Sequence, residues 1–350
     1  MAVFAKWRPY LLLSIFALAI IGLGYLALQQ IRDRTLAGRA ADGPGVVLLE
    51  GRSCDDAFRE VCIPSSLQDP TGVVDNVPIG EAAIERIRTR IAAENPEDPA
   101  EARRRLIEEV YSPARLQRAE AAFRWVKGAI LDEIESWAKS RRINARERRL
   151  IARRIKQVSL EFPDPKYPIY GADDVDIALL DELDFQGTKV RVGGAYLIRV
   201  NSWFNLVFTL AHELAHAIDP CELLADGLRL PVLDRISACF DRSGWIALRK
   251  TRKSCDQDDQ LPEVFADWIA TRVTAQALEI FAQEFHGNQV AAAVANSVRD
   301  LCDDDTPGPN AREVHHHPTA EMRINRIFAT HPTVRGLLGC VPSSLQPYCD

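Results

Sequence analysis

Three features are scarce or missing in this sequence. Histidine occurs seven times in 350 residues, so an HExxH motif arises by chance in roughly one such chain in a hundred. The eight cysteines include no Cys-x-x-Cys pair. No nucleic-acid-binding motif is present, so we expect no nucleic-acid partner. Apolar residues are not scarce: at 47% they exclude general disorder and predict one large or two small globular units.

The charge of the chain is unevenly distributed. The net charge is −6, but residues 81–160 hold 19 Lys and Arg against 13 Asp and Glu, a local balance of +6. The rest of the chain therefore sums to −12. Solvated helix faces are the simplest interpretation of the basic segment, and contact with anionic lipid or an acidic partner is the alternative.

One short stretch carries most of the chemistry. His212-Glu213-Leu214-Ala215-His216 puts two histidines one turn apart on one helix face, where both imidazoles can bind one metal ion. Asn201 or Ser202 can cap this helix, and Trp203 to Ile218 carry an apolar stripe. Two imidazoles suit Zn²⁺, with one ion expected per chain, and a third protein ligand would leave a position for water. Glu213 can then act as the catalytic base, which is metalloprotease chemistry.

Residues 10–28 form an uncharged apolar run of 19 residues, long enough for one membrane span. A cleaved signal peptide is the alternative, but its apolar core is usually shorter and precedes a small-x-small cleavage site. We therefore expect a retained single-pass anchor. Basic residues flank the run on both sides, so charge does not decide its orientation.

The cysteines decide the compartment. All eight lie beyond the apolar run, and their even number favours disulfides in an oxidising space, with eight reduced thiols as the alternative. We expect the catalytic part to be extracytoplasmic, periplasmic or extracellular. Short spacing favours the pairs Cys54–Cys62 and Cys340–Cys349, with the other four cysteines paired among themselves, although sequence alone does not give connectivity.

The remaining patterns predict a mainly α fold with a small β-sheet, in the α+β class. Four segments are expected: residues 1–35 as cytoplasmic tail and anchor, 36–80 as a stalk with a disulfide loop, 81–160 as a helical subdomain, and 161–350 as the catalytic domain. The helical subdomain rests on an apolar stripe from Leu116 to Trp137, continued from Leu150 to Val158. A separate partner-binding module is the alternative for this segment.

Two short strands are expected before the histidine helix. Lys189–Val192 and Ala195–Val200 are rich in β-branched and aromatic residues and flank Gly193-Gly194, which suggests a hairpin. Such a strand is a place where an extended peptide can add by main-chain hydrogen bonds. An ordinary hairpin without that role is the alternative.

A third metal ligand is expected in Pro262-Glu263-Val-Phe-Ala-Asp267. Pro262 fits the first turn of a helix, which puts Glu263 and Asp267 one turn apart on one face. We expect Glu263 to bind the metal and Asp267 to accept the second N–H of a ligating histidine. Asp219, just past the histidine helix, can likewise accept a hydrogen bond from a ligating histidine. A surface carboxylate near a helix start is the alternative for each.

A third motif follows near the C-terminus, where His317-Pro318 leads to Arg323-Ile324 and a helix is expected from Thr319 to Ala329. Together, HExxH, ExxAD and HPxxxxRI resemble the gluzincin zinc metallopeptidases. The likeness is strongest to the membrane metalloprotease family that includes the CAAX prenyl proteases and the stress-induced membrane proteases. It covers roughly residues 188–330, and the segment with Gly193-Gly194 is similar to that family's substrate-binding edge.

The resemblance implies His212, His216 and Glu263 as zinc ligands and Glu213 as the catalytic carboxylate. It also implies that His317 and Arg323 lie near the site, where either can stabilise an oxyanion. A salt bridge from Arg323 to Asp267 is the alternative for that residue. The chain departs from the multi-span members in having one candidate span and many cysteines.

The expected function is therefore a membrane-anchored zinc endopeptidase that cuts protein or peptide substrates outside the cytoplasm. One alternative is a non-catalytic envelope protein that binds a partner on a zincin-like fold. Another is a zinc amidase acting on a non-protein amide. A closed structural zinc site has no use for a base such as Glu213, which weighs against the first alternative.

Overall fold

The computed structural model describes residues 51–62, 77–94, 98–163, 175–176, 178–200, 202–246, 255, 260–305, 317–341 and 348–349. The expected anchor at residues 10–28, the tail, most of the stalk and the candidate cap residue Asn201 lie outside these residues. Within the described part of the chain, no helix has both the length and the apolar character needed to cross a membrane.

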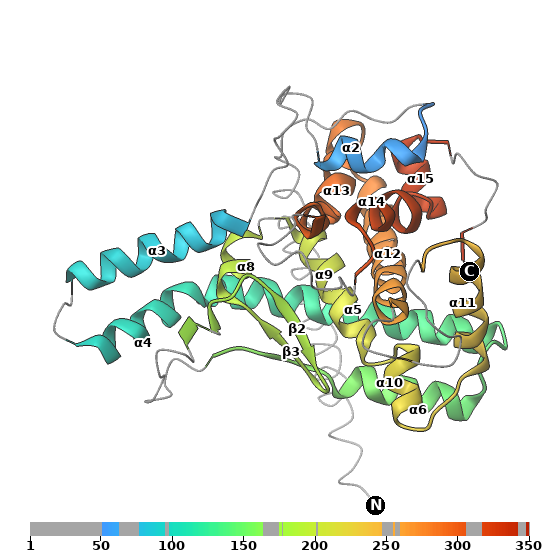
Figure 1. Ribbon diagram of the computed structural model, residues 1–350, viewed down its shortest axis with the longest axis horizontal. Coiled ribbons are helices and arrows are strands. Elements are labelled where there is room, and N and C mark those ends of the chain that lie inside the picture. Colours follow the sequence, from blue (N-terminus) through green and yellow to red (C-terminus); the bar gives the residue numbers. More distant parts are fainter. Residues whose placement is uncertain are drawn as a thin grey trace, which may run out of the picture.

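The described chain is mainly α-helical with one small three-stranded sheet, as the sequence predicts (Figure 1). Its elements, in chain order, are η1 (Cys54–Asp56), α2 (Ala57–Cys62), α3 (Val77–Glu94), α4 (Pro99–Val110), α5 (Pro113–Lys139), α6 (Ala145–Gln157), β1 (Ser159–Glu161), β2 (Leu183–Gln186), β3 (Lys189–Val192), α8 (Gly194–Arg199), α9 (Trp203–His216), α10 (Pro220–Ala225), α11 (Pro231–Arg242), α12 (Leu261–Ala282), α13 (Asn288–Ser297), η2 (Arg299–Asp305), α14 (Ala320–Met322), the π-helix η3 (Arg323–Phe328) and α15 (Pro332–Leu338).

The core is built where α9 packs against α12 on one side and α5 on the other. The expected stripe on α5 is buried from Ala119 to Trp137, and Trp137 stacks on Trp268 of α12 with ring centroids 6.1 Å apart. Both α9 and α12 are almost entirely buried, because they carry apolar side chains on every face. The metal motifs therefore lie on the most deeply packed helices.

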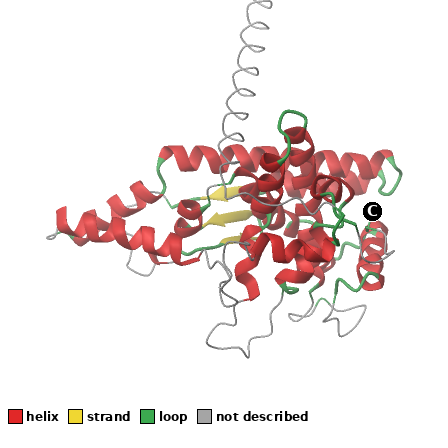
Figure 2. Cartoon of the chain, turned by 90° about the horizontal axis from the view of Figure 1, so that it is seen from above, coloured by secondary structure: helices red, strands yellow, loops and turns green. Residues whose placement is uncertain are grey.

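The sheet has the order β1-β3-β2, with β1 parallel and β2 antiparallel to β3. Its hairpin turns at Gly187, whose φ of +64° is in the left-handed region that favours glycine. Figure 2 shows the three strands side by side. Strand β2 is an edge strand, and it packs against α9.

The prediction of a strand at Ala195–Val200 is wrong: this segment is the helix α8. The glycine pair before it is required by close packing and not by a hairpin turn. A Cβ on Gly193 would lie 2.1 Å from the carbonyl oxygen of Leu180, and one on Gly194 would lie 2.7 Å from a methyl group of Val110. The sequence gives no sign of these contacts, because both partners are distant in the chain.

Helices α3 and α4 project from the main body as an antiparallel arm (Figure 1). Its base is held by Tyr111, whose hydroxyl donates to the carbonyl oxygen of Ala178 and lies 2.8 Å from that of Val192. Arg199 of α8 is buried between Asp181 and Asp300. The arm, the sheet and the C-terminal half are thus connected by buried polar contacts.

Four disulfides are present, which supports an extracytoplasmic domain, but the expected short pairs are wrong. The bonds join Cys54 to Cys340, Cys62 to Cys302, Cys221 to Cys255 and Cys239 to Cys349. Helical geometry is the reason for the error. Eight residues of helix separate Cys54 from Cys62 by about 12 Å, too far for one disulfide.

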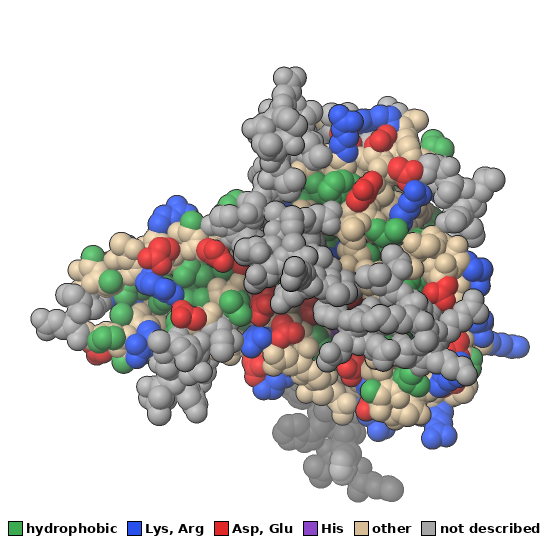
Figure 3. All heavy atoms as spheres, viewed as in Figure 1, with side chains coloured by type: hydrophobic (Ala, Val, Ile, Leu, Met, Phe, Trp, Pro, Cys, Tyr) green, Lys and Arg blue, Asp and Glu red, His purple; other side chains and the backbone are tan. Residues whose placement is uncertain are grey.

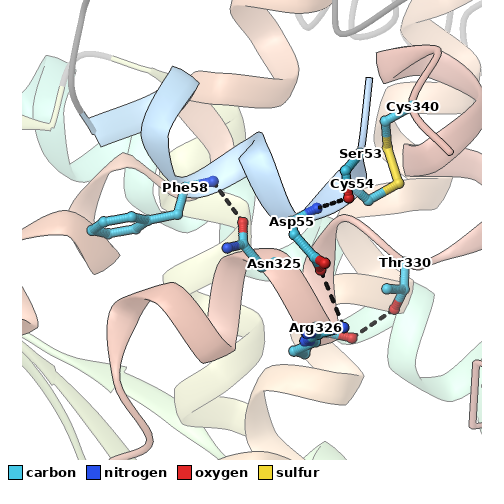
Figure 4. The surroundings of a disulfide bond; sticks show 8 residues. All are labelled: Ser53, Cys54, Asp55, Phe58, Asn325, Arg326, Thr330 and Cys340. Carbon is cyan, nitrogen blue, oxygen red and sulfur yellow. Dashed lines mark hydrogen bonds and ion pairs between the residues drawn. A yellow bond between two sulfur atoms is a disulfide. The ribbon is translucent and has the colours of Figure 1, made fainter. Parts of the chain in front are cut away.

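The first two disulfides attach the N-terminal segment η1–α2 to the C-terminal half of the chain. Figure 4 shows the first of them, between Cys54 and Cys340. Backbone and side-chain contacts reinforce them: the Phe58 N–H donates to Asn325 Oδ1 at 2.7 Å, and Arg326 pairs with Asp55 at 3.1 Å. Asn325 and Arg326 belong to η3. This part of the expected stalk region is therefore docked directly on the π-helix.

We expect peptide mapping of the unreduced protein by mass spectrometry to yield the four long-range cystine peptides. A cystine peptide that joins Cys54 to Cys62, or Cys340 to Cys349, would contradict this connectivity.

Removing Cys62 and Cys302 together should lower the free energy of unfolding by about 2–5 kcal/mol, because the unfolded chain gains conformational freedom. Urea denaturation of the double alanine variant measures this loss.

Candidate metal centre

Helix α9 presents the two histidines. Ser202 caps its start by accepting a hydrogen bond from the Asn205 N–H, and the helix ends at His216, before Asp219 caps α10. The His212 ring is buried at 6% exposure and the His216 ring is 15% exposed. Their ring centroids lie 5.0 Å apart, as expected for one face of a helix.

Helix α12 presents the carboxylates. Pro262 lies in its first turn, and Glu263 and Asp267 follow on the face turned toward α9. Glu263 Oε2 lies 3.1 Å from His212 Nε2 and 3.8 Å from His216 Nε2. Among the described residues, His212, His216 and Glu263 form the group that could hold a metal ion, with ligand atoms all within 4.8 Å of one another.

The three ligand atoms fit a zinc ion. Ligands bound about 2.0–2.1 Å from a tetrahedral zinc stand about 3.3 Å apart, close to the separations between Glu263 and the two histidines. Glu263 Oε2 is also buried without a hydrogen bond of regular geometry, although three imidazole nitrogens surround it. A cation at the point shared by Glu263 and the His212 and His216 rings would satisfy these three ligands.

Each imidazole is oriented by a carboxylate on its far side. His212 Nδ1 lies 3.0 Å from Asp267 Oδ1, and His216 Nδ1 lies 3.3 Å from Asp219 Oδ2. Asp219 also accepts the N–H groups of Cys221 and Glu222 at the start of α10. A carboxylate on Nδ1 favours the tautomer that leaves Nε2 free to bind a metal.

Arg323 lies on Asp267 and does not line the pocket. Its guanidinium makes two bonds to the carboxylate, Nε to Oδ2 at 2.8 Å and Nη2 to Oδ1 at 2.9 Å, and both side chains are almost fully buried. The geometry thus matches the alternative interpretation, in which Arg323 orients the ligand set through Asp267.

His317 stands at the opening of the site. Its ring is 46% exposed and stacks on the ring of His212, with Nε2 2.8 Å from Glu263 Oε2. Its carbonyl oxygen accepts a hydrogen bond from Gln260 at 3.2 Å, which ties this residue to the chain just before α12. The helix expected from Thr319 to Ala329 is present, but it consists of two parts, α14 and the π-helix η3.

Glu213 faces an open pocket. The pocket has a volume of about 390 Å³ and is lined by the three candidate ligands together with Leu183, Asp184, Phe185, Glu213, Asp219, Cys221, Glu222, Pro262 and His317. Glu213 Oε2 accepts a hydrogen bond of 3.0 Å from the Phe185 N–H of β2. The carboxylate is therefore held beside the metal position by the edge strand.

The electrostatics of the cluster favour a cation. Burial lowers the pKa of His212, but Asp267 and Glu263 outweigh it and raise the value to about 10. Burial raises the pKa of Glu263, yet its histidine contacts hold it well below the ordinary value. Glu213 differs, because burial raises its pKa above the usual range and so makes it a stronger base.

Comparison of the chain with models of known protein families and with curated proteins of known function found no match. A hypothesis on the chemistry of this chain therefore rests on the three motifs and their geometry.

The sequence missed the residues that β2 contributes. Phe185 supplies both the N–H that binds Glu213 and a ring that stacks on His216 at 6.4 Å. The alternation in Leu183-Asp-Phe-Gln186, followed by Gly187, is a hairpin signal that would have located this strand. Cys221 and Glu222 were also not expected at the pocket.

We expect Arg323→Ala to lower the free energy of unfolding by about 3–5 kcal/mol, because it leaves the Asp267 charge buried and unpaired. Arg326→Ala, on the same π-helix, is the matched control. Its pair with Asp55 is partly exposed, so the loss should stay below about 1 kcal/mol. Urea denaturation in the presence of a chelator measures both; equal losses would contradict the buried role of Arg323.

Proposed function

We propose that the protein is a zinc-dependent endopeptidase that hydrolyses peptide bonds of extracytoplasmic proteins. The observation that carries this proposal is the meeting of His212, His216 and Glu263 at one point beside Glu213, in a pocket open to solvent. A structural zinc site is closed by a fourth protein ligand, whereas a catalytic site keeps one position open. The four disulfides support the oxidising compartment.

Zinc, when bound, would polarise the substrate carbonyl and make water acidic enough to ionise near neutral pH. Glu213 would accept a proton from the attacking water and deliver it to the leaving amide nitrogen. The raised pKa of this buried carboxyl suits both transfers. Between the two proton transfers, the hydrogen bond from the Phe185 N–H keeps the Glu213 carboxylate directed into the pocket.

Two other groups have separate tasks. His317 stands at the pocket opening, where its ring can donate a hydrogen bond to the oxyanion that forms as water attacks. Arg323 and Asp267 act one layer away, because they hold the His212 ring in its binding orientation. We therefore assign catalysis to Glu213 and His317, and positioning to Arg323, Asp267 and Asp219.

Membership of the gluzincins, near the membrane metalloproteases, is part of the proposal. Three motifs that are distant in the sequence meet in one place, as that resemblance implies: the histidines, Glu263 with Asp267, and His317 with Arg323. A single anchor at residues 10–28 would make this a catalytic domain held at a membrane. A non-catalytic partner-binding role would not explain the open pocket or the position of Glu213 beside the candidate ligands.

We expect the purified protein to hold about one zinc ion per chain, and His212→Ala combined with His216→Ala to abolish zinc binding. Elemental analysis after dialysis measures this. Full occupancy in the double variant would contradict the ligand assignment.

Glu213→Gln should keep its zinc and lose a factor of about 10²–10⁴ in turnover, because it removes the base alone. A peptide-library digest read by mass spectrometry measures the activity, and Glu120→Gln, on the exposed face of α5, is the control for charge. Zinc-dependent hydrolysis of non-peptide amides without any peptide cleavage would favour the amidase alternative.

His317→Ala should lower kcat by a factor of about 10²–10³ with KM nearly unchanged, since a donor to the oxyanion acts in the transition state more than in the ground state. Zinc content measured in parallel should stay full. Loss of zinc would instead make His317 a ligand or a support of Glu263.

A further inference from the structure

Positive charge is concentrated on helix α6 and the residues just before it. Residues 139–157 hold nine Lys and Arg and one acid, whereas the whole chain has a net charge of −6. Ile151 and Ile155 fix one face of the helix in the core. Outside them runs an exposed line of cations at steps of three and four residues, which we name the cationic stripe: Arg146, Arg149, Arg153 and Lys156.

The stripe differs from helix α4, where Arg104 and Arg105 are paired with acidic residues. On α4, Arg104 pairs with Glu101 and Glu108, and Arg105 pairs with Glu94. The four stripe residues have no ion-pair partner in the described part of the chain. The single acid of α6, Glu147, accepts a hydrogen bond from the N–H of the cap residue Asn144. Repulsion among unpaired cations on one face opposes folding unless an outside anion balances them.

A groove beside the stripe has the chemistry to bind such an anion. It has a volume of about 390 Å³ and is lined by Arg148, Arg149, Arg153 and Lys156 together with Glu135, Ala152 and Gln157. Guanidinium groups match phosphate geometry with two parallel hydrogen bonds. Arg148 is partly balanced by Glu135, at 3.0 Å, which leaves the other three cations for a ligand.

We propose that the cationic stripe and its groove bind the anionic phospholipid headgroups of the membrane that residues 10–28 are predicted to cross. A chain anchored in a bilayer meets that surface at a high effective concentration, which no soluble acidic partner shares. In Figure 3 several blue side chains stand at the lower right rim, over the region of α5 and α6 in Figure 1. One edge of the domain is thus suited to an anionic surface.

The tether permits this orientation. Residues 29–50 separate the predicted span from the first described residue, and 22 residues reach at most about 75 Å. Arg154 of α6 contacts the carbonyl oxygen of Ala217, directly after the metal-bearing helix, so docking of the stripe would also hold the pocket relative to the membrane.

The test uses the full chain in nanodiscs of phosphatidylcholine alone or with phosphatidylglycerol, and follows acylation of lysines by mass spectrometry. Each bound cation strengthens attachment roughly fivefold, so we expect Lys156 to react at least about tenfold more slowly in the anionic discs. The rate at which the same lysine reacts in the phosphatidylcholine discs is the reference. At 0.5 M salt the protection should disappear, because screening shortens the range of the attraction.

A charge-reversal variant and its matched control complete the test. Arg149→Glu with Arg153→Glu should abolish protection of Lys156, whereas Arg86→Glu with Arg235→Glu makes the same charge change on exposed residues elsewhere and should preserve it. Equal reactivity of Lys156 in both discs would overturn the proposal, as would protection in the uncharged discs. Failure of the chain to enter either disc would overturn it too, and protection only by an added soluble polyanion would assign the stripe to another partner.

Discussion

The candidate site depends on the Asp267 carboxylate being buried between Arg323 and His212. Removing a carboxylate from water is costly, and this one is stable only because two bonds from the guanidinium and one contact with the imidazole balance its charge. Burial alone would raise the pKa of Asp267, but Arg323 and His212 lower it to about 2. The orientation of His212 follows from this ion pair.

The same principle explains why the cluster fits a cation. Two histidines are surrounded by three carboxylates, those of Glu263, Asp267 and Asp219. Arg323 neutralises the carboxylate of Asp267. Without a metal ion, protons must supply the missing positive charge, which accounts for the high pKa of His212. A zinc ion would supply that charge from the centre and leave both imidazoles neutral. The arrangement is thus electrostatically incomplete without a cation, and this supports the proposed centre.

The π-helix η3 connects this cluster to the N-terminal segment. Its first residue, Arg323, holds Asp267, while Asn325 contacts Phe58 of α2 and Arg326 pairs with Asp55 of η1 (Figure 4). The disulfides at Cys54 and Cys62 fix that segment covalently to the C-terminal half. Residues 54–62, which belong to the expected stalk region, are therefore attached close to the element that supports the candidate metal centre. π-Helices often occur at functional sites, where the extra residue turns a side chain toward its target.

Local patterns in the sequence determined a large part of this protein. The spacing of His212 and His216, and of Glu263 and Asp267, requires only helical periodicity, so each pair could be placed on one face in advance. The apolar stripe of α5 and the mainly α fold class follow from the same periodicity. These predictions hold because the interacting residues lie within one or two turns of each other.

Only the tertiary structure decided which distant residues meet. Phe185 reaches Glu213, and Arg323 reaches Asp267, through the packing of whole elements. The four cystine pairs also differ from those that short spacing favours, because a helix keeps Cys54 away from Cys62. The apolar run from Ala195 suits a strand locally, yet it is the helix α8, which packs against α3 and α4 of the arm. Contacts between segments far apart in the chain depend on the energy of the complete core, which no local pattern contains.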